Sequence, residues 1–355
     1  MLTTKQALKK LILWVVLGLA LIAGVTILFD PFYQYHGVLP GMKDVLYEKE
    51  TQVIGSIRNF SYDSVLLGSS VAENCDTVYL DEVYSIKTLK VIRASGSTAD
   101  LLYYLDAAHE QQELKWVFYG LDLFALKKPY EVTVVSEYSP RYLYTDTILD
   151  DGAYLFNKDV LLKKIPMLLA YSVFDKNTGG HAYDWWEDKE FGTEKAMQAY
   201  DGPGEMVSDF DFSGEKETIA ENIGLLTEEI AGHPDVNYTF FFPPYSLLMW
   251  DDVCRQGEGE EYCYMLGEAL PRLLAFDNVE VYYFQTDKDI VYNLDLYMDT
   301  LHYSPEINQY MLTSIAEEDD RYRLTRDNWQ EAVTSLEQMC QEITQEEIYR
   351  YYPEN

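Results

Sequence analysis

The sequence predicts an α/β protein, a three-layer sandwich built on a mostly parallel β-sheet, with one transmembrane helix at its N-terminus. Three observations predict this class. Short apolar runs alternate with helical stretches along much of the 355-residue chain, a pattern typical of parallel sheets covered by helices on both faces. An uncharged apolar run occupies residues 11–29. The remaining chain is long enough for one large domain with a sizeable core.

The apolar run at residues 11–29 is long enough to span a membrane, because roughly 20 apolar residues cross the hydrocarbon core. The lysines that precede it are Lys5, Lys9 and Lys10. Positive residues stay in the cytoplasm, so we expect residues 1–10 inside the cell and residues 30–355 outside it. A cleaved signal peptide is the alternative. A retained anchor is favoured, since no small-x-small cleavage site precedes Asp30.

Five segments are expected to form strands, because each is a short apolar run: residues 64–68, 89–94, 115–121, 237–242 and 279–284. Helices are expected at residues 98–111, 160–171, 215–231, 305–317 and 329–349. In the third of these helices, apolar residues recur at the spacing of one helix face. They are Ile219, Ile223, Leu226 and Ile230.

Two of these helices have recognisable start signals. Ser304 precedes Pro305, which predicts a serine N-cap followed by a proline in the first turn. The last helix has a possible earlier start at Asp327, where Gln330 would complete a capping box. Between them lies the acidic run 317–320, which is expected to face solvent.

Residues 127–213 break the alternating pattern and are expected to form an insertion, not a second domain. The segment contains the pair Trp185-Trp186 and several glycines. An insertion between core strands often forms a substrate wall. A structural cap is a nearly equal alternative.

The composition limits the partners and bonds of the chain. A net charge of −33 argues against nucleic acid and against anionic lipid surfaces. The 31 tyrosines suit sugar binding, but ordinary packing explains most of them. A Cys254–Cys263 disulfide and four free thiols are equally good expectations in an exported domain. The sequence lacks Cys/His metal spacing, and neither a metal nor a cofactor is expected.

Two segments far apart in the sequence contain the parts of a serine-hydrolase site. Ser70 follows the predicted strand 64–68, and Asp299 and His302 stand three apart just before a helix start. A serine hydroxyl becomes nucleophilic when an imidazole takes its proton and a carboxylate orients that imidazole. Taken alone, Ser70 would be a helix-capping serine and His302 a structural histidine. Together, at the carboxyl end of a parallel sheet, they favour catalysis.

These segments resemble a known superfamily. Gly68-Ser69-Ser70, followed by Glu73-Asn74, resembles the first block of the SGNH (GDSL-like) hydrolases, and Asp299-Thr300-Leu301-His302 resembles the last block. More narrowly, the chain resembles the membrane-anchored branch that includes the D-alanyl transfer protein of lipoteichoic-acid biosynthesis and the polysaccharide O-acetylation proteins. The resemblance covers residues 62–124, 236–246 and 279–316. It implies that Ser70 is the nucleophile, His302 the general base and Asp299 its orienting partner.

The resemblance also implies an oxyanion hole, which this chain matches in part. The backbone N–H of Ser70 and the glycine Gly96 fit the pattern. The third block has Asp122 where the superfamily has asparagine, and an ionised carboxylate cannot donate a hydrogen bond. Asp122 would be protonated, another donor such as Asn74 would replace it, or turnover would be slow. The residues expected to line the pocket are Ser69, Asp122 and Tyr245, although Tyr245 could equally serve only to end its strand.

The predicted function is an extracytoplasmic esterase or acyltransferase that forms an acyl-serine and acts on a cell-envelope glycopolymer such as a polysaccharide or a teichoic-acid-like polymer. The resemblance implies that a multispanning membrane O-acyltransferase works beside it. The alternative is a catalytically decayed protein that binds a glycan or a partner through Trp185 and Trp186. A structural surface subunit is a third interpretation, which leaves the two blocks unexplained.

Overall fold

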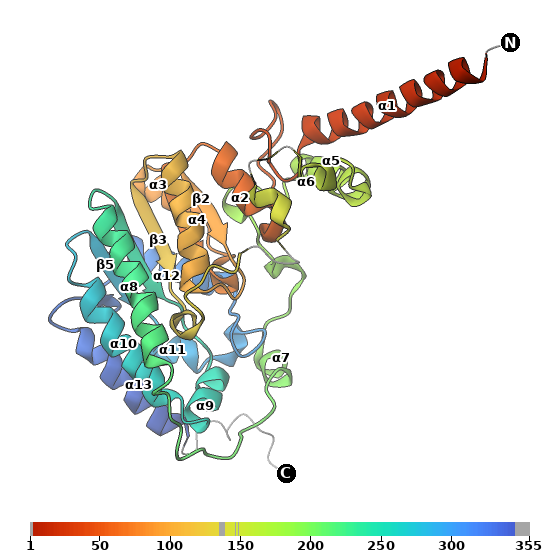
Figure 1. Cartoon of the computed structure of the whole chain (residues 1–355). Coiled ribbons are helices and arrows are strands. Elements are labelled where there is room, and N and C mark those ends of the chain that lie inside the picture. The colour runs from red at the N-terminus through yellow and green to blue at the C-terminus, as the bar shows by residue number, and fades with distance from the viewer. Residues whose placement is uncertain (1–2, 135–138, 146, 148, 345–355) are drawn as a thin grey trace. The chain divides into compact units, whose positions relative to one another are not determined.

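The structure is a computed structural model that describes residues 3–134, 139–145, 147 and 149–344. It divides into two compact units, one of residues 1–60 and 134–179 and the other of residues 61–133 and 180–355. The helices (Figure 1) are α1 (Thr4–Phe29), α2 (Lys49–Asn59), α3 (Thr77–Tyr84), α4 (Thr98–Gln111), α5 (Gly152–Leu155), α6 (Ile165–Phe174), α7 (Thr193–Gln198), α8 (Lys216–Gly232), α9 (Leu247–Arg255), α10 (Gly259–Leu273), α11 (Lys288–Val291), α12 (Pro305–Ala316) and α13 (Trp329–Ile343). The strands are β1 (Ser64–Gly68), β2 (Thr88–Ile92), β3 (Trp116–Gly120), β4 (Asn237–Phe242), β5 (Val279–Tyr283) and β6 (Arg323–Leu324).

The first unit contains α1, which is long and apolar enough to cross a membrane, with a mean hydropathy of 2.8. Thr3 and Gln6 form a capping box at its start. The helix ends at Asp30, whose carboxylate accepts the backbone N–H groups of Tyr35 and His36 and the hydroxyl of Tyr154. These bonds fix the exit of the chain from the helix. The expected division into a cytoplasmic N-terminus, an anchor and one external domain stays a prediction.

The second unit is built on a sheet whose six strands, in the described part of the chain, run in the order β2-β1-β3-β4-β5-β6. The pairs from β2 to β5 are parallel, and β6 is antiparallel at the edge. The register places Ser64 between Thr88 and Trp116. The strands are almost wholly buried, as expected for a parallel sheet covered on both faces. The mixed α/β fold class is therefore confirmed.

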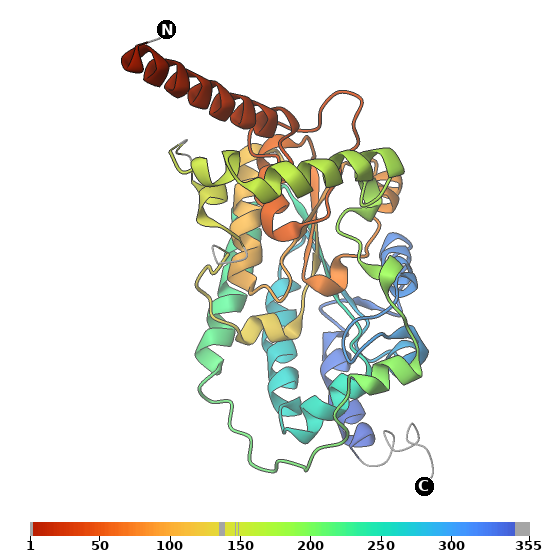
Figure 2. The ribbon, with the colours of Figure 1, turned by 90° about the vertical axis from the view of Figure 1, so that its right-hand side faces the viewer.

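Helices form the outer layers of this unit. On one side α4, α8, α10 and α13 pack in sequence, each against the next, and on the other side α3 packs against α12 (Figure 2). The face of α8 predicted from its periodicity, Ile219, Ile223, Leu226 and Ile230, is buried. The helical periodicity thus identified the side of α8 that closes the core.

Each strand and helix predicted from the sequence is present, but several others were not predicted, among them α2, α3, α9, α10 and β6. β6 was not expected, because two residues give no periodicity. Ser304 is the N-cap of α12, but its hydroxyl donates to the Glu306 carboxylate and accepts no hydrogen bond from a helix N–H. The capping box at Asp327 is wrong, since α13 begins after Asn328 with no side-chain cap. Its predicted extension over residues 345–349 lies outside the described residues.

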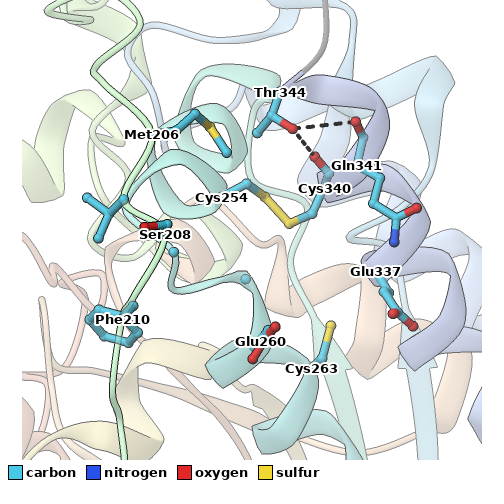
Figure 3. A pocket seen from close by; sticks show the side chains of 13 residues that line it. Met206, Ser208, Phe210, Cys254, Glu260, Cys263, Glu337, Cys340, Gln341 and Thr344 are labelled. Carbon is cyan, nitrogen blue, oxygen red and sulfur yellow. Dashed lines mark hydrogen bonds between the residues drawn. A yellow bond between two sulfur atoms is a disulfide. The ribbon is translucent and has the colours of Figure 1, made fainter.

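The cysteine expectations are wrong in both of their forms. The disulfide joins Cys254 of α9 to Cys340 of α13, with Cα atoms 5.5 Å apart (Figure 3). Cys263 stays a free thiol beside it and lines the same cavity of about 510 Å³. A Cβ at Gly259 would lie 2.9 Å from the Cys340 sulfur, so the glycine lets α13 approach. Helix packing, not closeness in sequence, determines the pairing.

Candidate active site

The strand order produces a topological switch point in the sheet. After β1 the chain adds β2 on one side and then β3 on the other. The connections therefore leave the sheet in opposite directions at the carboxyl ends of β1 and β3, which is where open α/β sheets bind their ligands. Ser70 follows β1 and Asp122 follows β3. Both predicted site residues thus lie at this switch point.

The turn that carries Ser70 requires close packing behind it. A Cβ at Gly68 would lie 2.5 Å from the Ala72 side chain, so only glycine lets the chain fold back at the end of β1. Ser69 is buried, and Ser70 begins a short 3₁₀ turn that ends at Ala72. The first N–H groups of such a turn have no partner within it. The Ser70 N–H is therefore suited to bind an anion.

Ser70, His302 and Asp299 form a continuous hydrogen-bond chain. Ser70 Oγ lies 2.9 Å from His302 Nε2, and His302 Nδ1 lies 2.8 Å from Asp299 Oδ2. The other carboxylate oxygen, Asp299 Oδ1, accepts the backbone N–H groups of Leu301 and His302 at 2.8 and 2.7 Å. These bonds assign Nδ1–H to the aspartate side, so Nε2 is the nitrogen free to accept the serine proton.

The electrostatics of Asp299 keep it ionised. Its burial would raise the pKa of the carboxyl, but the hydrogen bond and charge of His302 and the backbone N–H groups outweigh it and hold that pKa below its ordinary value. The carboxylate is about one quarter exposed. A carboxylate that remains charged orients the imidazole and stabilises it when it becomes protonated.

The loop that carries the pair is fastened to the rest of the sheet edge. Tyr303 Oη and Asn308 Nδ2 both donate to the carbonyl of Val71, in the serine turn, at 2.9 Å. Ser246 Oγ, just after β4, donates to the Thr300 carbonyl at 2.6 Å. The loop between α11 and α12 is thus held against two strand ends. This explains how residues 232 positions apart meet with hydrogen-bond accuracy.

Asp122 is buried beneath this site and is hydrogen-bonded to Tyr245. It is 3% exposed, and Tyr245 Oη donates to its Oδ1 at 2.8 Å. Burial raises the pKa of Asp122, and the hydroxyls of Ser69 and Tyr245 only partly oppose that effect. Tyr245 is itself fully buried, so its ring packs in the core behind the site. The raised pKa widens the pH range over which Asp122 is neutral.

The two other expected oxyanion donors have partners in the structure. Gly96 N–H donates to the Arg93 carbonyl at 2.9 Å, so an oxyanion would have to share that N–H. The Asn74 side-chain oxygen accepts the backbone N–H of Trp185 at 3.2 Å. That bond assigns the orientation of the amide, whose NH₂ group is then the end available to an acceptor. The oxyanion roles of both residues stay predictions.

Trp185 is a site residue that sequence reasoning did not place. Its indole N–H donates to the Ser70 carbonyl at 3.2 Å, and its ring meets the His302 ring edge to face, with centroids 5.5 Å apart. The ring also stacks on Phe191. Trp185 therefore forms a wall against both the serine turn and the imidazole. Only the tryptophan pair in a glycine-punctuated insertion hinted at this.

The Trp185 loop is held by a fully buried lysine. Lys90 Nζ donates to the carbonyls of Glu73, Gly180 and Ala182 at 2.6, 3.0 and 2.7 Å, and it pairs with Asp184 at 3.1 Å. A buried ammonium is tolerated only when its donors are satisfied. Lys90 thus joins β2, the serine turn and the loop before Trp185.

Comparisons with known proteins add little to this geometry. No protein-family model matches the chain, and no curated protein matches it. A solved structure from Streptococcus pneumonia, provisionally described as a platelet activating factor, is similar over 78% of this chain and 93% of its own, at 13% identity and a TM-score of 0.39. A similarity of that strength supports no inference about activity, which must be argued from the site.

Proposed function

We propose that this protein is a membrane-anchored serine esterase or O-acyltransferase of the SGNH type. The observation that carries the proposal is the hydrogen-bond chain from Ser70 Oγ through His302 to Asp299. It supplies a nucleophile, a base and an orienting carboxylate in reach of one another, at the edge of the sheet where ligands bind. No cofactor is needed for this chemistry.

The proposed reaction proceeds through an acyl-serine. His302 Nε2 takes the Ser70 proton while Oγ attacks the ester carbonyl, which gives a tetrahedral oxyanion. The imidazolium then protonates the departing alkoxide as its bond to the carbonyl carbon breaks. Water or a sugar hydroxyl next gives its proton to His302 and attacks the acyl-serine. The imidazolium then returns a proton to Ser70 Oγ as the bond between Oγ and the carbonyl carbon breaks, which restores the free serine. The Ser70 N–H, with Asn74, Gly96 or a neutral Asp122, would stabilise the oxyanion.

The proposed setting is the outer face of a cell membrane. α1 is long and apolar enough to anchor the chain, and the lysines before it favour a cytoplasmic N-terminus. The Cys254–Cys340 disulfide suits an oxidising compartment. We propose a cell-envelope glycopolymer, a polysaccharide or teichoic-acid-like polymer, as acyl acceptor or donor. A multispanning membrane O-acyltransferase would supply or receive the acyl group.

The second candidate is a decayed site that only binds glycan. Asp122 in place of asparagine favours it, and Trp185 and Trp186 would provide the binding surface. The geometry of Ser70, His302 and Asp299 weighs against loss of catalysis, because a site that no longer catalyses would not be expected to keep all three side chains in hydrogen-bond alignment.

The test is covalent labelling of the full chain in detergent with a fluorophosphonate probe, followed by peptide mapping. Labelling at Ser70 that disappears in His302→Ala, with Ser69→Ala as the matched serine control, would support an activated serine. A folded protein that leaves Ser70 unlabelled would refute the enzyme proposal and favour the binding protein.

A further inference from the structure

A second cluster of reactive side chains lies at the ends of α4 and α8, away from the serine turn. His109 stands in the last turn of α4, Glu229 in the last turn of α8, and His233 directly after α8. Glu229 and His233 are four residues apart, so they share one helix face. α4 starts beside the carboxyl edge of the sheet and runs for 14 residues, which places its end about 20 Å away. The cluster is therefore independent of the proposed active site.

The three side chains lie close enough together to share one ion. Their potential ligand atoms all lie within 4.8 Å of one another. His109 Nε2 is 3.0 Å from Glu229 Oε1, and His233 Nε2 is 3.8 Å from Glu229 Oε2. The two imidazole rings stack in parallel with centroids 3.6 Å apart. Because imidazole lone pairs lie in the ring planes, two stacked rings cannot both point at one ion. Binding of an ion therefore requires the partly exposed His233 ring to turn out of the stack.

The surroundings of the cluster could support a bound ion. Glu229 is further oriented by the hydroxyl of Tyr238, which donates to Oε1 at 2.8 Å, as outer-shell groups orient metal ligands. His109 and Glu229 are about nine-tenths buried, while His233 is 35% exposed, so the point is sheltered but open on one side.

We propose that His109, Glu229 and His233 bind a divalent transition-metal ion of the zinc type. Imidazole nitrogens with one carboxylate are ligands that Zn²⁺ prefers, at about 2.0–2.2 Å from the ion. Three protein ligands leave a fourth position for water on the open side at His233. The bound ion joins the end of α4 to the connection between α8 and β4. Its role is structural, since it fixes two segments of the chain that are 120 residues apart.

The test uses the full chain in detergent, stripped of metal by dialysis against a chelator and titrated with Zn²⁺ by calorimetry. We expect one equivalent to bind, with a rise in the thermal unfolding midpoint. His233→Ala and Glu229→Gln should each weaken binding by at least about tenfold and remove that rise. Glu228→Gln, the same charge change at an exposed neighbour, should leave both unchanged.

A second measurement keeps the proposal falsifiable if a variant folds poorly. Co²⁺ bound to the unmodified chain should show the intense visible bands of a low-coordinate site with nitrogen ligands, and Zn²⁺ should displace it. The proposal would be overturned if the chain did not bind Zn²⁺, or if His233→Ala bound it as tightly as the parent. It would also be overturned if Glu228→Gln lost Zn²⁺ binding to the same extent as the ligand variants, or if the Co²⁺ spectrum were that of the hydrated ion.

Discussion

Replacing Asp122 by asparagine tests which form of this buried acid the site uses. Tyr245 already donates to Oδ1, so the proton of a neutral Asp122 belongs on Oδ2. That O–H is the one part of the side chain able to donate to an oxyanion. Asp122→Asn keeps the acceptor toward Tyr245 and puts a permanent NH₂ donor in place of the O–H, with almost no change of volume.

The loss of one oxyanion donor determines the size of the effect, and the raised pKa of Asp122 determines the pH at which it occurs. One oxyanion donor contributes about 10²–10³ in kcat. Because only the neutral acid donates, activity of the parent should fall by up to that factor as pH rises through the pKa of Asp122. Asp122→Asn cannot ionise, so its activity should persist on that alkaline side. The acid limb of the pH–activity profile, along which the general base His302 loses its proton as pH rises, should not move.

The free energy of unfolding should also depend on the ionisation of Asp122, and it should fall as pH rises. A raised folded-state pKa contributes stability that is complete below the ordinary carboxyl pKa and is lost as pH rises through the raised value. Asp122→Asn should therefore be more stable than the parent above that point. The gain is about 1.4 kcal/mol for each unit by which the pKa of Asp122 is raised.

The assay is hydrolysis of a small aryl acetate across pH, together with urea unfolding at acid and alkaline pH. Tyr245→Phe serves as the control, because it removes the partner hydroxyl and leaves the acid at Asp122 in place. An alkaline limb that is unchanged in Asp122→Asn would contradict the role of the neutral acid. So would a loss of activity in that variant at every pH.

Four further outcomes are expected. Asp299→Asn should lower kcat by about 10⁴ through the wrong imidazole tautomer, and a loss below tenfold in steady-state kinetics would contradict the triad. Trp185→Phe, which keeps the ring and removes the N–H, should lower kcat several-fold with little change in thermal midpoint; an unchanged kcat would make the tryptophan a bystander. Lys90→Met should remove activity and expose the 180–185 loop to proteolysis, because four polar partners lose their donor; normal protease resistance would count against the tether. Cys340→Ser should lower the free energy of unfolding by about 2–5 kcal/mol, and equal stability of the parent with and without reductant would refute that role for the bridge to Cys254.

The strands and the three triad residues could be predicted because their signals are local. Each strand is one apolar run, and Asp299 and His302 lie within one loop. Ser70 and this loop were expected to meet from the rule that parallel strands end at one edge, and their hydrogen-bond distance agrees with it. Their catalytic role stays a prediction, which the labelling experiment tests.

The remaining parts of the site depend on contacts that no local pattern encodes. Trp185 donates to a carbonyl 115 residues away, and Lys90 reaches one 92 residues away. A lysine on a predicted strand is normally assigned to solvent, because burying its charge is costly. Here the 180–184 loop supplies the carbonyls that satisfy it. The burial of Lys90 and the position of Trp185 therefore depend on each other, because the loop whose carbonyls bind the ammonium also places the indole against Ser70.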